Sequence, residues 1–302
     1  MESIHIPVLI DEVLEGLCVK EGGLYFDGTL GGAGHTIALS RKVGPTGLII
    51  ATDRDLKAID AAEERIKRES NFENQSIKLP IRLAQANYRD FEAVFELLKI
   101  DSVDGFLLDL GLSSDQIADR NRGFSFDSDG ELDLRFDVSE GLPAYELLNK
   151  WNVDKIADII YQYGEERYSR RIARAIVEYR TRQPIRIAKE LADICRRCIP
   201  TPPWNQRIDP ATRTFQALRI AVNDELNALE SFLKKAPQYL KPNGRIAIIS
   251  FHSLEDRIVK NTFRENSILE AITKKPIEAT DLELSRNPRA RSAKLRIAQR
   301  IQ

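Results

Sequence analysis

Hydrophobic residues along the first 111 positions alternate between short apolar runs and stretches with helical spacing. A near-continuous apolar run that ends in a polar residue is typical of a parallel strand buried on both faces. Between the runs, apolar residues recur three or four positions apart, as at Ile59, Ala62 and Ile66. Strands that alternate with helices in this way predict a doubly wound parallel sheet. The predicted strands are residues 24–27, 47–53, 81–86 and 103–109.

The pattern changes after Gly111, because helical spacing dominates residues 112–210. Strand and sheet-packing patterns then return. Residues 215–233 carry one apolar helix face, residues 245–251 form an apolar run, and residues 293–301 alternate apolar and basic side chains, as a closing edge strand does.

The predicted fold class is therefore α/β, a doubly wound Rossmann-like sheet with an inserted, mainly helical subdomain. Residues 1–111 and 211–302 make up the sheet domain, and residues 112–210 make up the insertion. The insertion is the expected place for substrate recognition.

Glycine is concentrated between the first predicted strand and its helix. The segment reads Asp27-Gly-Thr-Leu-Gly-Gly-Ala-Gly-His-Thr36, with four glycines in seven residues. Such a turn brings backbone N–H groups and a helix N-terminus close to a ligand, because a Cβ would hold the ligand away. The third glycine of a dinucleotide fingerprint is missing. The remaining pattern resembles the first motif of S-adenosylmethionine-dependent methyltransferases, and the alternative is an ordinary tight turn.

Two further residues lie where a nucleoside would contact such a sheet. Asp53 ends the second predicted strand about twenty residues beyond the glycine loop, where an acidic residue typically meets ribose hydroxyls. A helix N-cap is the alternative role for Asp53. Tyr88 follows the third predicted strand and could flank the adenine as an aromatic wall.

Composition describes an ordinary globular protein: 302 residues, 42% hydrophobic and 30% charged, with a formal net charge of −1. Three cysteines are too few for a disulfide framework, and no apolar stretch approaches the length of a membrane span. We therefore expect a cytoplasmic protein that does not contact membranes. Cys195 and Cys198 have C-x-x-C spacing without a second pair, so no metal site is predicted.

Basic residues are unevenly distributed despite the balanced total. Residues 165–210 hold 11 Lys/Arg against 6 Asp/Glu, and residues 285–302 hold 6 Lys/Arg with no acid. Arginine dominates both segments, and its planar guanidinium suits phosphate. These segments favour a nucleic-acid partner over the alternative of a solvated helix face. The candidate RNA contacts are Arg120, Arg122, Arg170, Arg171, Arg174, Arg213, His252, Arg289 and Arg291.

Taken together, the motifs resemble those of the bacterial 16S ribosomal RNA cytosine-N4 methyltransferases over nearly the whole chain. The resemblance is carried by His5-Ile-Pro-Val-Leu, the glycine segment Asp27–His35, Asp53-Arg-Asp55, Leu107-Leu-Asp-Leu-Gly-Leu-Ser-Ser114, Arg122-Gly-Phe-Ser-Phe126, Tyr163-Gly-Glu-Glu-Arg167, Ala211-Thr-Arg-Thr-Phe-Gln-Ala217, Ser250-Phe-His-Ser-Leu-Glu-Asp-Arg257 and Asn287-Pro-Arg-Ala-Arg-Ser292.

The resemblance implies a specific reaction and partner. The methyl donor would be S-adenosylmethionine, and the substrate a decoding-region cytidine of 16S rRNA within the small ribosomal subunit, methylated at N4. It implies neither DNA nor a membrane as partner, and it is compatible with a homodimer. The implied cofactor-binding residues are Gly32, Ala33, Gly34, His35, Asp53, Tyr88, Asp109 and Gln116.

The cytosine amine is a poor nucleophile because its lone pair is delocalised into the ring. An acceptor on an N–H and tight positioning would help it attack a sulfonium methyl. Asp109 and Ser113, at the end of the fourth predicted strand, are the candidate catalytic residues, although Asp109 could serve the cofactor instead. Phe124 or Phe126 could stack on the unstacked base, with a core position as the commoner alternative.

Two other function classes compete with this interpretation. A small-molecule methyltransferase or nicotinamide enzyme fits the sheet, but the missing third glycine and the arginine-rich insertion argue against it. A non-catalytic ribosome-assembly factor fits the basic segments, but it would not need Asp27, Asp53 and the glycines together.

Overall fold

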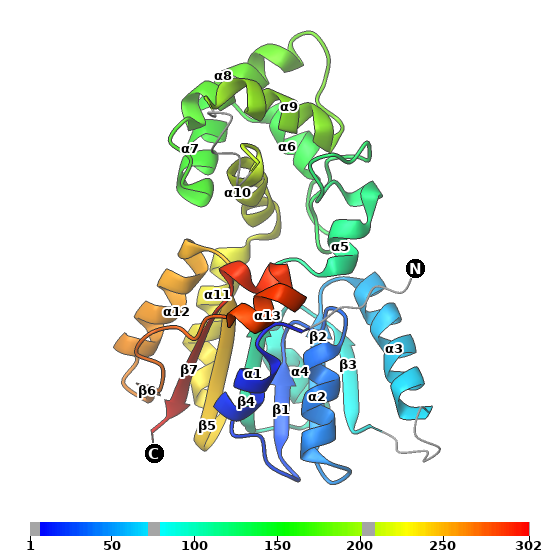
Figure 1. Cartoon of the computed structure of the whole chain (residues 1–302), viewed down its shortest axis with the longest axis vertical. Helices are drawn as coiled ribbons and strands as arrows, with labels where there is room; N and C mark the ends of the chain where they lie inside the picture. Colours follow the sequence, from blue (N-terminus) through cyan, green and yellow to red (C-terminus); the bar gives the residue numbers. More distant parts are fainter. Residues whose placement is uncertain (1–6, 72–78, 201–208, 302) are drawn as a thin grey trace. The chain divides into compact units, whose positions relative to one another are not determined.

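A computed structural model describes residues 7–71, 79–200 and 209–301 of the chain. The chain divides into two compact units, drawn in Figure 1. The first unit contains residues 1–113 and 226–302, and the second contains residues 114–225. The second unit is therefore inserted into the sequence of the first.

The first unit is built on a seven-stranded sheet with the order β3-β2-β1-β4-β5-β7-β6. The first five strands in this order are parallel, whereas β7 runs antiparallel to both of its neighbours. This arrangement confirms the predicted α/β class. The strands are β1 (Leu24–Asp27), β2 (Leu48–Asp53), β3 (Ile81–Gln85), β4 (Val103–Asp109), β5 (Leu240–Ser250), β6 (Leu269–Ala271) and β7 (Lys294–Arg300).

Helices cover both faces of the sheet, which explains why the central strands are almost wholly apolar. On one face, Phe26 and Phe106 pack with aromatic and aliphatic residues of α4 (Phe91–Leu98), α11 (Glu225–Lys235) and α12 (Ser253–Glu265). On the other face, Tyr25 and Leu107 pack with α1 (Ile10–Gly16) and α2 (Gly34–Val43). The remaining helices of this unit are α3 (Leu56–Asn71) and α13 (Asp281–Arg286).

The strand order places a topological switch point between β1 and β4. The chain moves from β1 outward to β2 and β3, and from β4 in the opposite direction to β5. Open α/β sheets bind ligands beyond the carboxyl ends of the strands at such a point. Asp27 and Asp109 end the two neighbouring strands here.

The second unit consists mainly of helices: α5 (Ser114–Ala118), α6 (Ala144–Lys150), α7 (Val153–Gly164), α8 (Ser169–Arg180), α9 (Ala188–Cys198) and α10 (Thr212–Asn223). It extends further than the predicted boundary at residue 210, because α10 packs on α7. Gln216 donates to the Tyr163 carbonyl at 2.9 Å. A Cβ on Gly164 would lie 2.5 Å from the Arg213 carbonyl oxygen, so glycine permits this close approach.

Two sequence expectations about the C-terminal part were wrong. The single helix face over residues 215–233 is divided, since Asp224 adopts a left-handed conformation (φ 54°) between α10 and α11. The strand at residues 293–301 is not the edge of the sheet, because β6 pairs with its outer side. In the described part of the chain, no helix has the length and apolar character needed to cross a membrane.

Candidate active site

A buried carboxylate organises the end of β1. Asp27 is 1% exposed and accepts hydrogen bonds from the Thr29 backbone N–H (3.1 Å) and the Thr36 hydroxyl (2.6 Å). Burial raises the pKa of Asp27, and these hydrogen bonds oppose the rise. Asp27 thus joins the strand, the glycine loop and the first turn of α2 through one side chain.

Two positions of the loop require glycine, and a neighbouring helix holds the loop in place. Gly31 has a positive φ of 45°, and a Cβ on Gly28 would lie 2.4 Å from Leu108 Cδ2. Ala33 is the N-cap of α2 and contributes no side-chain cap to the helix N-terminus. Arg65 of α3 donates to the Gly32 carbonyl at 2.5 Å and holds the loop from outside. Arg65 and the close packing at Gly28 thus hold the loop in place.

Asp53 fixes the glycine loop from the end of β2. Its carboxylate accepts from the Gly31 N–H and from the Asp55 N–H, both at 2.9 Å. Burial raises the pKa of Asp53 to about 6, so it is ionised at neutral pH. The carboxylate of Asp55 accepts from the Lys57 N–H at 3.1 Å, at the entry to α3. Capping of α3 therefore involves Asp55, while Asp53 faces the loop.

Tyr88 borders the same loop. It begins a short 3-10 turn, η1 (Tyr88–Asp90), after β3, and its ring packs edge-on against Phe232 with centroids 5.8 Å apart. The Tyr88 Cβ lies 2.7 Å from the position that a Gly28 Cβ would take. The aromatic residue and the glycine loop are thus immediate neighbours.

Asp109 is held at the end of β4 in contact with α2. Its backbone N–H donates to the Thr29 hydroxyl at 2.6 Å, and its Oδ2 lies 3.5 Å from His35 Nδ1. Burial, together with the charges of Asp27 and Glu255, raises the pKa of Asp109 to about 8. Its Oδ1 is buried and has no hydrogen-bond partner among the described residues. One carboxyl oxygen at the switch point is therefore left to receive a donor.

Ser113 follows the turn at Gly111, which has a φ of 109° and packs on Phe251. The Ser113 Cβ would lie 3.8 Å from a Cβ on Gly31, so this residue stands beside the glycine loop. Gln116 is buried in α5 of the second unit. The first unit therefore brings together the glycine loop, Asp53, Tyr88, Asp109 and Ser113.

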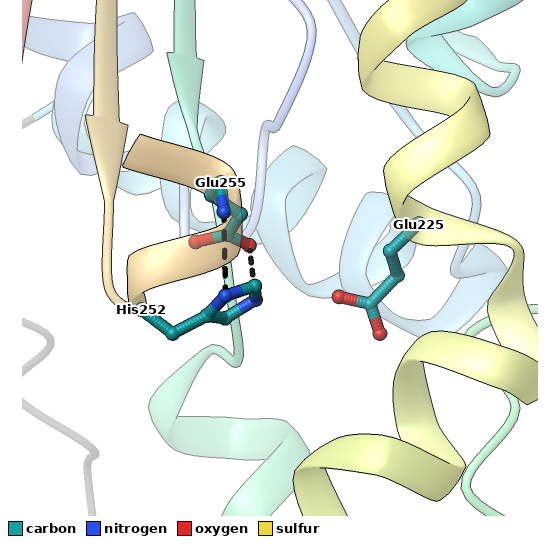
Figure 2. A group of neighbouring side chains, drawn as sticks. All are labelled: Glu225, His252 and Glu255. Carbon is teal, nitrogen blue, oxygen red and sulfur yellow. Dashed lines mark hydrogen bonds and ion pairs between the residues drawn. The ribbon is translucent and has the colours of Figure 1, made fainter. Parts of the chain in front are cut away.

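His252 caps a helix. Figure 2 shows its ring against Glu255: Nδ1 accepts from the Glu255 N–H at 3.4 Å, and Nε2 lies 3.1 Å from the Glu255 carboxylate. The other oxygen of that carboxylate accepts from the Phe251 N–H at 2.9 Å. The His252 side chain is 9% exposed. The structure supports the capping role for His252 rather than a contact with RNA phosphate.

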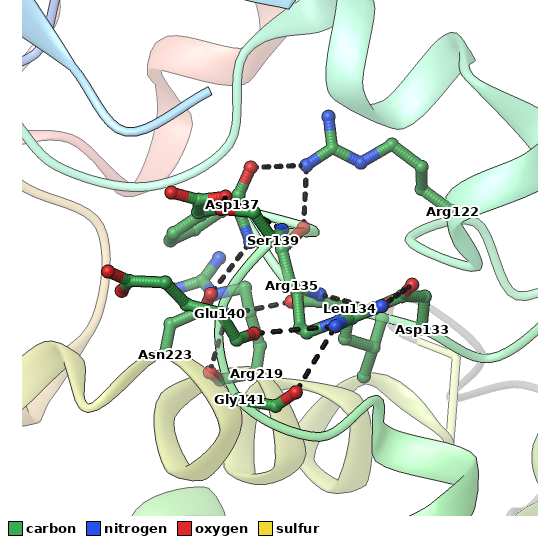
Figure 3. Close-up of polar contacts among 11 residues, drawn as sticks. Arg122, Asp133, Leu134, Arg135, Asp137, Ser139, Glu140, Gly141, Arg219 and Asn223 are labelled. Carbon is green, nitrogen blue, oxygen red and sulfur yellow. Dashed lines mark hydrogen bonds and ion pairs between the residues drawn. The ribbon is translucent and has the colours of Figure 1, made fainter. Parts of the chain in front are cut away.

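The predicted RNA contact at Arg122 is wrong. Arg122 is 5% exposed, and Figure 3 shows its guanidinium directed at the loop, where it donates to the Arg135 (2.6 Å) and Phe136 (2.7 Å) carbonyls. Phe124 is also buried and stacks on Phe136 at 5.9 Å, so it cannot present a face to a flipped base. Both residues stabilise the loop after α5, as does Asn223, which accepts from the Phe136 N–H.

The other candidate arginines are exposed. Arg170, Arg171 and Arg174 lie along the exposed face of α8, where one helix turn presents three guanidinium groups. Arg213 donates to the Glu165 carbonyl at 3.1 Å while remaining exposed. Arg120, Arg289 and Arg291 are exposed as well. Each unit therefore carries accessible arginine.

Apart from Asp27, which the sequence already marked, the residues that support the glycine loop and Asp109 were missed from sequence. Asp27 and Thr36 form the hydrogen-bond network under the glycine loop, Arg65 braces the loop, and Glu255 adds negative charge near Asp109. The position of Asp27 at the end of a strand was the one available signal. Arg65 and Glu255 act across elements that lie far apart in sequence, whereas Thr36 lies only nine residues after Asp27.

Comparison with known proteins agrees with this geometry. A family model described as the MraW methylase family matches residues 2–301. The chain belongs to this family. It is a methyltransferase, as the motifs predicted, and S-adenosylmethionine is its methyl donor.

The chain spans most of the length of each of three relatives. The chain is 46% identical to the ribosomal RNA small subunit methyltransferase H of Rhodopirellula baltica, covering 100% of this chain and 93% of that protein. Proteins of the same name from Nitratidesulfovibrio vulgaris (45%, 99% and 86%) and Cyanothece sp. (46%, 99% and 96%) are similar to it as well.

Proposed function

We propose that this methylase transfers the methyl group of S-adenosylmethionine to N4 of a decoding-region cytidine in 16S rRNA, within the small ribosomal subunit. The observation that carries the proposal is the buried Asp109 carboxyl at the switch point, with one oxygen lacking a partner among the described residues. The names of the full-length relatives support rRNA as substrate. The enzyme would work in the cytoplasm, and homodimerisation stays a prediction.

The residues around the switch point fit this cofactor. Gly28 lets the loop pack closely on the sheet, since a Cβ there would lie 2.4 Å from Leu108 Cδ2 and 2.7 Å from the Tyr88 Cβ. Residues 32–35 at the N-terminus of α2 would receive the carboxylate of the methionine part, because helix N-termini favour anions. Asp53 would bind the ribose hydroxyls, and Tyr88 would flank the adenine. Gln116 joins the set on the family resemblance alone.

Bound S-adenosylmethionine supplies an electrophilic methyl group on a sulfonium. Asp109 is placed to act on the nucleophile: its Oδ1 can accept an N–H of the cytosine amine and draw the nitrogen lone pair out of the ring. The Thr29 hydroxyl accepts from the Asp109 backbone N–H at 2.6 Å, so the backbone that carries the carboxyl is held before substrate enters. Ser113, beside Gly31, would orient the base.

Exposed arginines would hold the RNA backbone. Arg170, Arg171 and Arg174 offer forked donors along one helix, and phosphate contacts of this kind fix position without reading sequence. Recognition of one cytidine would then depend on how the target base fits beside Asp109. The remaining proposed contacts are Arg120, Arg213, Arg289 and Arg291.

The test is transfer of labelled methyl to small ribosomal subunits from cells that lack this protein, followed by nuclease mapping. We expect incorporation at a single decoding-region cytidine, lost in Asp109→Asn and kept in Asp101→Asn, an exposed residue that undergoes the same chemical change. Incorporation at other nucleotides, or full activity of Asp109→Asn, would contradict the proposal.

A further inference from the structure

His35 has a hydrogen-bond arrangement that fixes its tautomer. Its Nε2 lies 2.9 Å from the Val8 carbonyl oxygen, and a carbonyl can only accept. Nε2 must therefore carry a hydrogen. Burial lowers the pKa of His35 to about 4, so the ring is neutral at physiological pH. A neutral ring protonated at Nε2 has a lone pair at Nδ1.

That lone pair faces Asp109. His35 Nδ1 and Asp109 Oδ2 are 3.5 Å apart, at the outer limit of a hydrogen bond, and both side chains are largely buried. If Asp109 were ionised, a lone pair of its Oδ2 would face the lone pair of His35 Nδ1, and the two would repel each other. A protonated carboxyl would instead donate its hydrogen to Nδ1. The tautomer imposed by Val8 thus favours the carboxylic acid form of Asp109.

The other charged groups around Asp109 act in the same direction. Asp27 approaches from β1 and Glu255 from α12, and both carboxylates disfavour a third negative charge. The pKa of Asp109, about 8, agrees with the tautomer argument, although the two rest on different physical causes. In the free enzyme, Asp109 is therefore a proton donor to His35 and a poor acceptor for an amine.

We propose that Asp109 and His35 hold one proton between them in the free enzyme, and that Asp109 releases it to solvent when a cationic methyl donor binds. The inference rests on the proposed function, which brings the sulfonium to this site. A positive charge nearby favours the ionised carboxylate, whereas the neutral thioether of S-adenosylhomocysteine does not.

Over one turnover, the proton that Asp109 releases is replaced by the proton that the amine loses. Asp109–COOH becomes Asp109–COO⁻ and one proton enters the buffer on binding. When the N–C bond forms and the sulfur keeps the electron pair of the C–S bond, the amine nitrogen must lose a proton. The ionised Asp109 takes that proton and, once the positive charge has gone, keeps it. His35 acts here as a positioning residue.

Calorimetric titration in buffers of different ionisation enthalpy counts the protons released on binding. At pH 7 we expect S-adenosylmethionine to release about 0.9 proton more than S-adenosylhomocysteine, falling to about 0.5 at pH 8 and about 0.1 at pH 9. The two ligands share the same α-amino and carboxylate groups, so the difference isolates the sulfonium. In Asp109→Asn the difference should vanish.

Nitrogen NMR of the imidazoles tests the role of His35 directly. The chain has 3 histidines, so His35→Gln assigns the signal by subtraction. We expect a neutral ring protonated at Nε2 from pH 5 to pH 8. A ring protonated at Nδ1, or doubly protonated, would place the proton on His35 and overturn the inference.

The outcomes separate the inference from the function it rests on. Binding of S-adenosylmethionine without extra proton release overturns the inference and leaves the proposed function standing. Absence of binding, or binding unaffected by changes at Asp53 and Tyr88, removes the proposed cofactor site itself. Equal release with both ligands shows that charge is not the cause and also overturns the inference.

Discussion

Replacing Asp109 with asparagine should stabilise the protein while abolishing its activity. Asparagine has the shape of a protonated carboxyl, and its amide can donate to His35 Nδ1 as the acid does. It also removes a group that the fold forces out of its preferred ionised state. Buried active-site groups of this kind commonly lower stability in favour of function.

The size of the effect follows from the pKa of about 8, against 3.8 for an ordinary aspartate. A carboxyl with a raised folded-state pKa contributes stability at low pH that is lost as pH rises toward the folded value. Each pKa unit corresponds to about 1.4 kcal/mol. Relative to the wild type, the variant should gain about 0.5 kcal/mol at pH 4, about 3 at pH 6 and about 5 at pH 8.

Thermal unfolding of the ligand-free protein, followed by circular dichroism, measures this gain. At roughly 2 °C per kcal/mol, the Tm of Asp109→Asn should exceed that of the wild type by ~10 °C at pH 8 and by ~1 °C at pH 4.

Asp104→Asn is the matched control of opposite sign. Burial raises the pKa of Asp104, but hydrogen bonds from Lys20 and Lys241 and from the Leu24 N–H lower it overall. Removing that charge should destabilise the protein above pH 4. A Tm difference for Asp109→Asn that stays constant between pH 4 and pH 8 would refute the assignment of Asp109 as a protonated buried acid.

Three further changes test other parts of the site. Asp53→Ala should weaken binding of S-adenosylmethionine tenfold to a hundredfold, since a charged hydrogen bond contributes roughly 1.5–3 kcal/mol; unchanged affinity in a calorimetric titration would remove Asp53 from the site. Gly28→Ala should lower the Tm by several degrees, because the new Cβ would lie 2.4 Å from Leu108 and such overpacking costs about 1–3 kcal/mol; an unchanged melting curve would show that the loop can yield. Arg170→Gln should reduce the slope of log affinity for rRNA against log salt by about 0.7–0.9, with no change in Tm. Arg122→Gln should do the reverse, lowering the Tm and leaving the salt slope alone, since its guanidinium serves the loop carbonyls.

The parts of the fold that were predictable from sequence depend on local patterns. The buried strands read as apolar runs, and the glycine cluster marked the ligand-facing turn because few other structures require so many glycines. Asp53 and Tyr88 were identifiable because strand ends share one edge of a parallel sheet. The alternation of apolar runs with helically spaced segments was enough to predict a parallel sheet. In such a sheet Asp53 and Tyr88 lie at the same edge as the glycine loop.

The parts that sequence did not reveal depend on long-range contacts. Arg122 is of the residue type that commonly contacts RNA phosphate. Its guanidinium instead donates to the carbonyls of residues 135 and 136, which lie more than ten positions away in sequence. The apolar period continues through Asp224, so only the left-handed backbone there shows that two helices meet. Likewise, the alternation of apolar and basic residues in β7 predicted an edge strand. In the structure β6 pairs with the outer side of β7, so β7 is not at the edge of the sheet.

The insertion of the second unit between β4 and β5 affects the order in which the chain can fold during synthesis. β4 is buried at every residue but its last, and it pairs with β1 on one side and β5 on the other. Its partner β5 leaves the ribosome about 130 residues later. At ~5–20 residues per second, that interval lasts roughly 7–26 s. Throughout it, an apolar strand edge is open to pairing with other chains. We therefore expect ribosome-bound chaperones to retain nascent chains of this enzyme until residue 250 emerges.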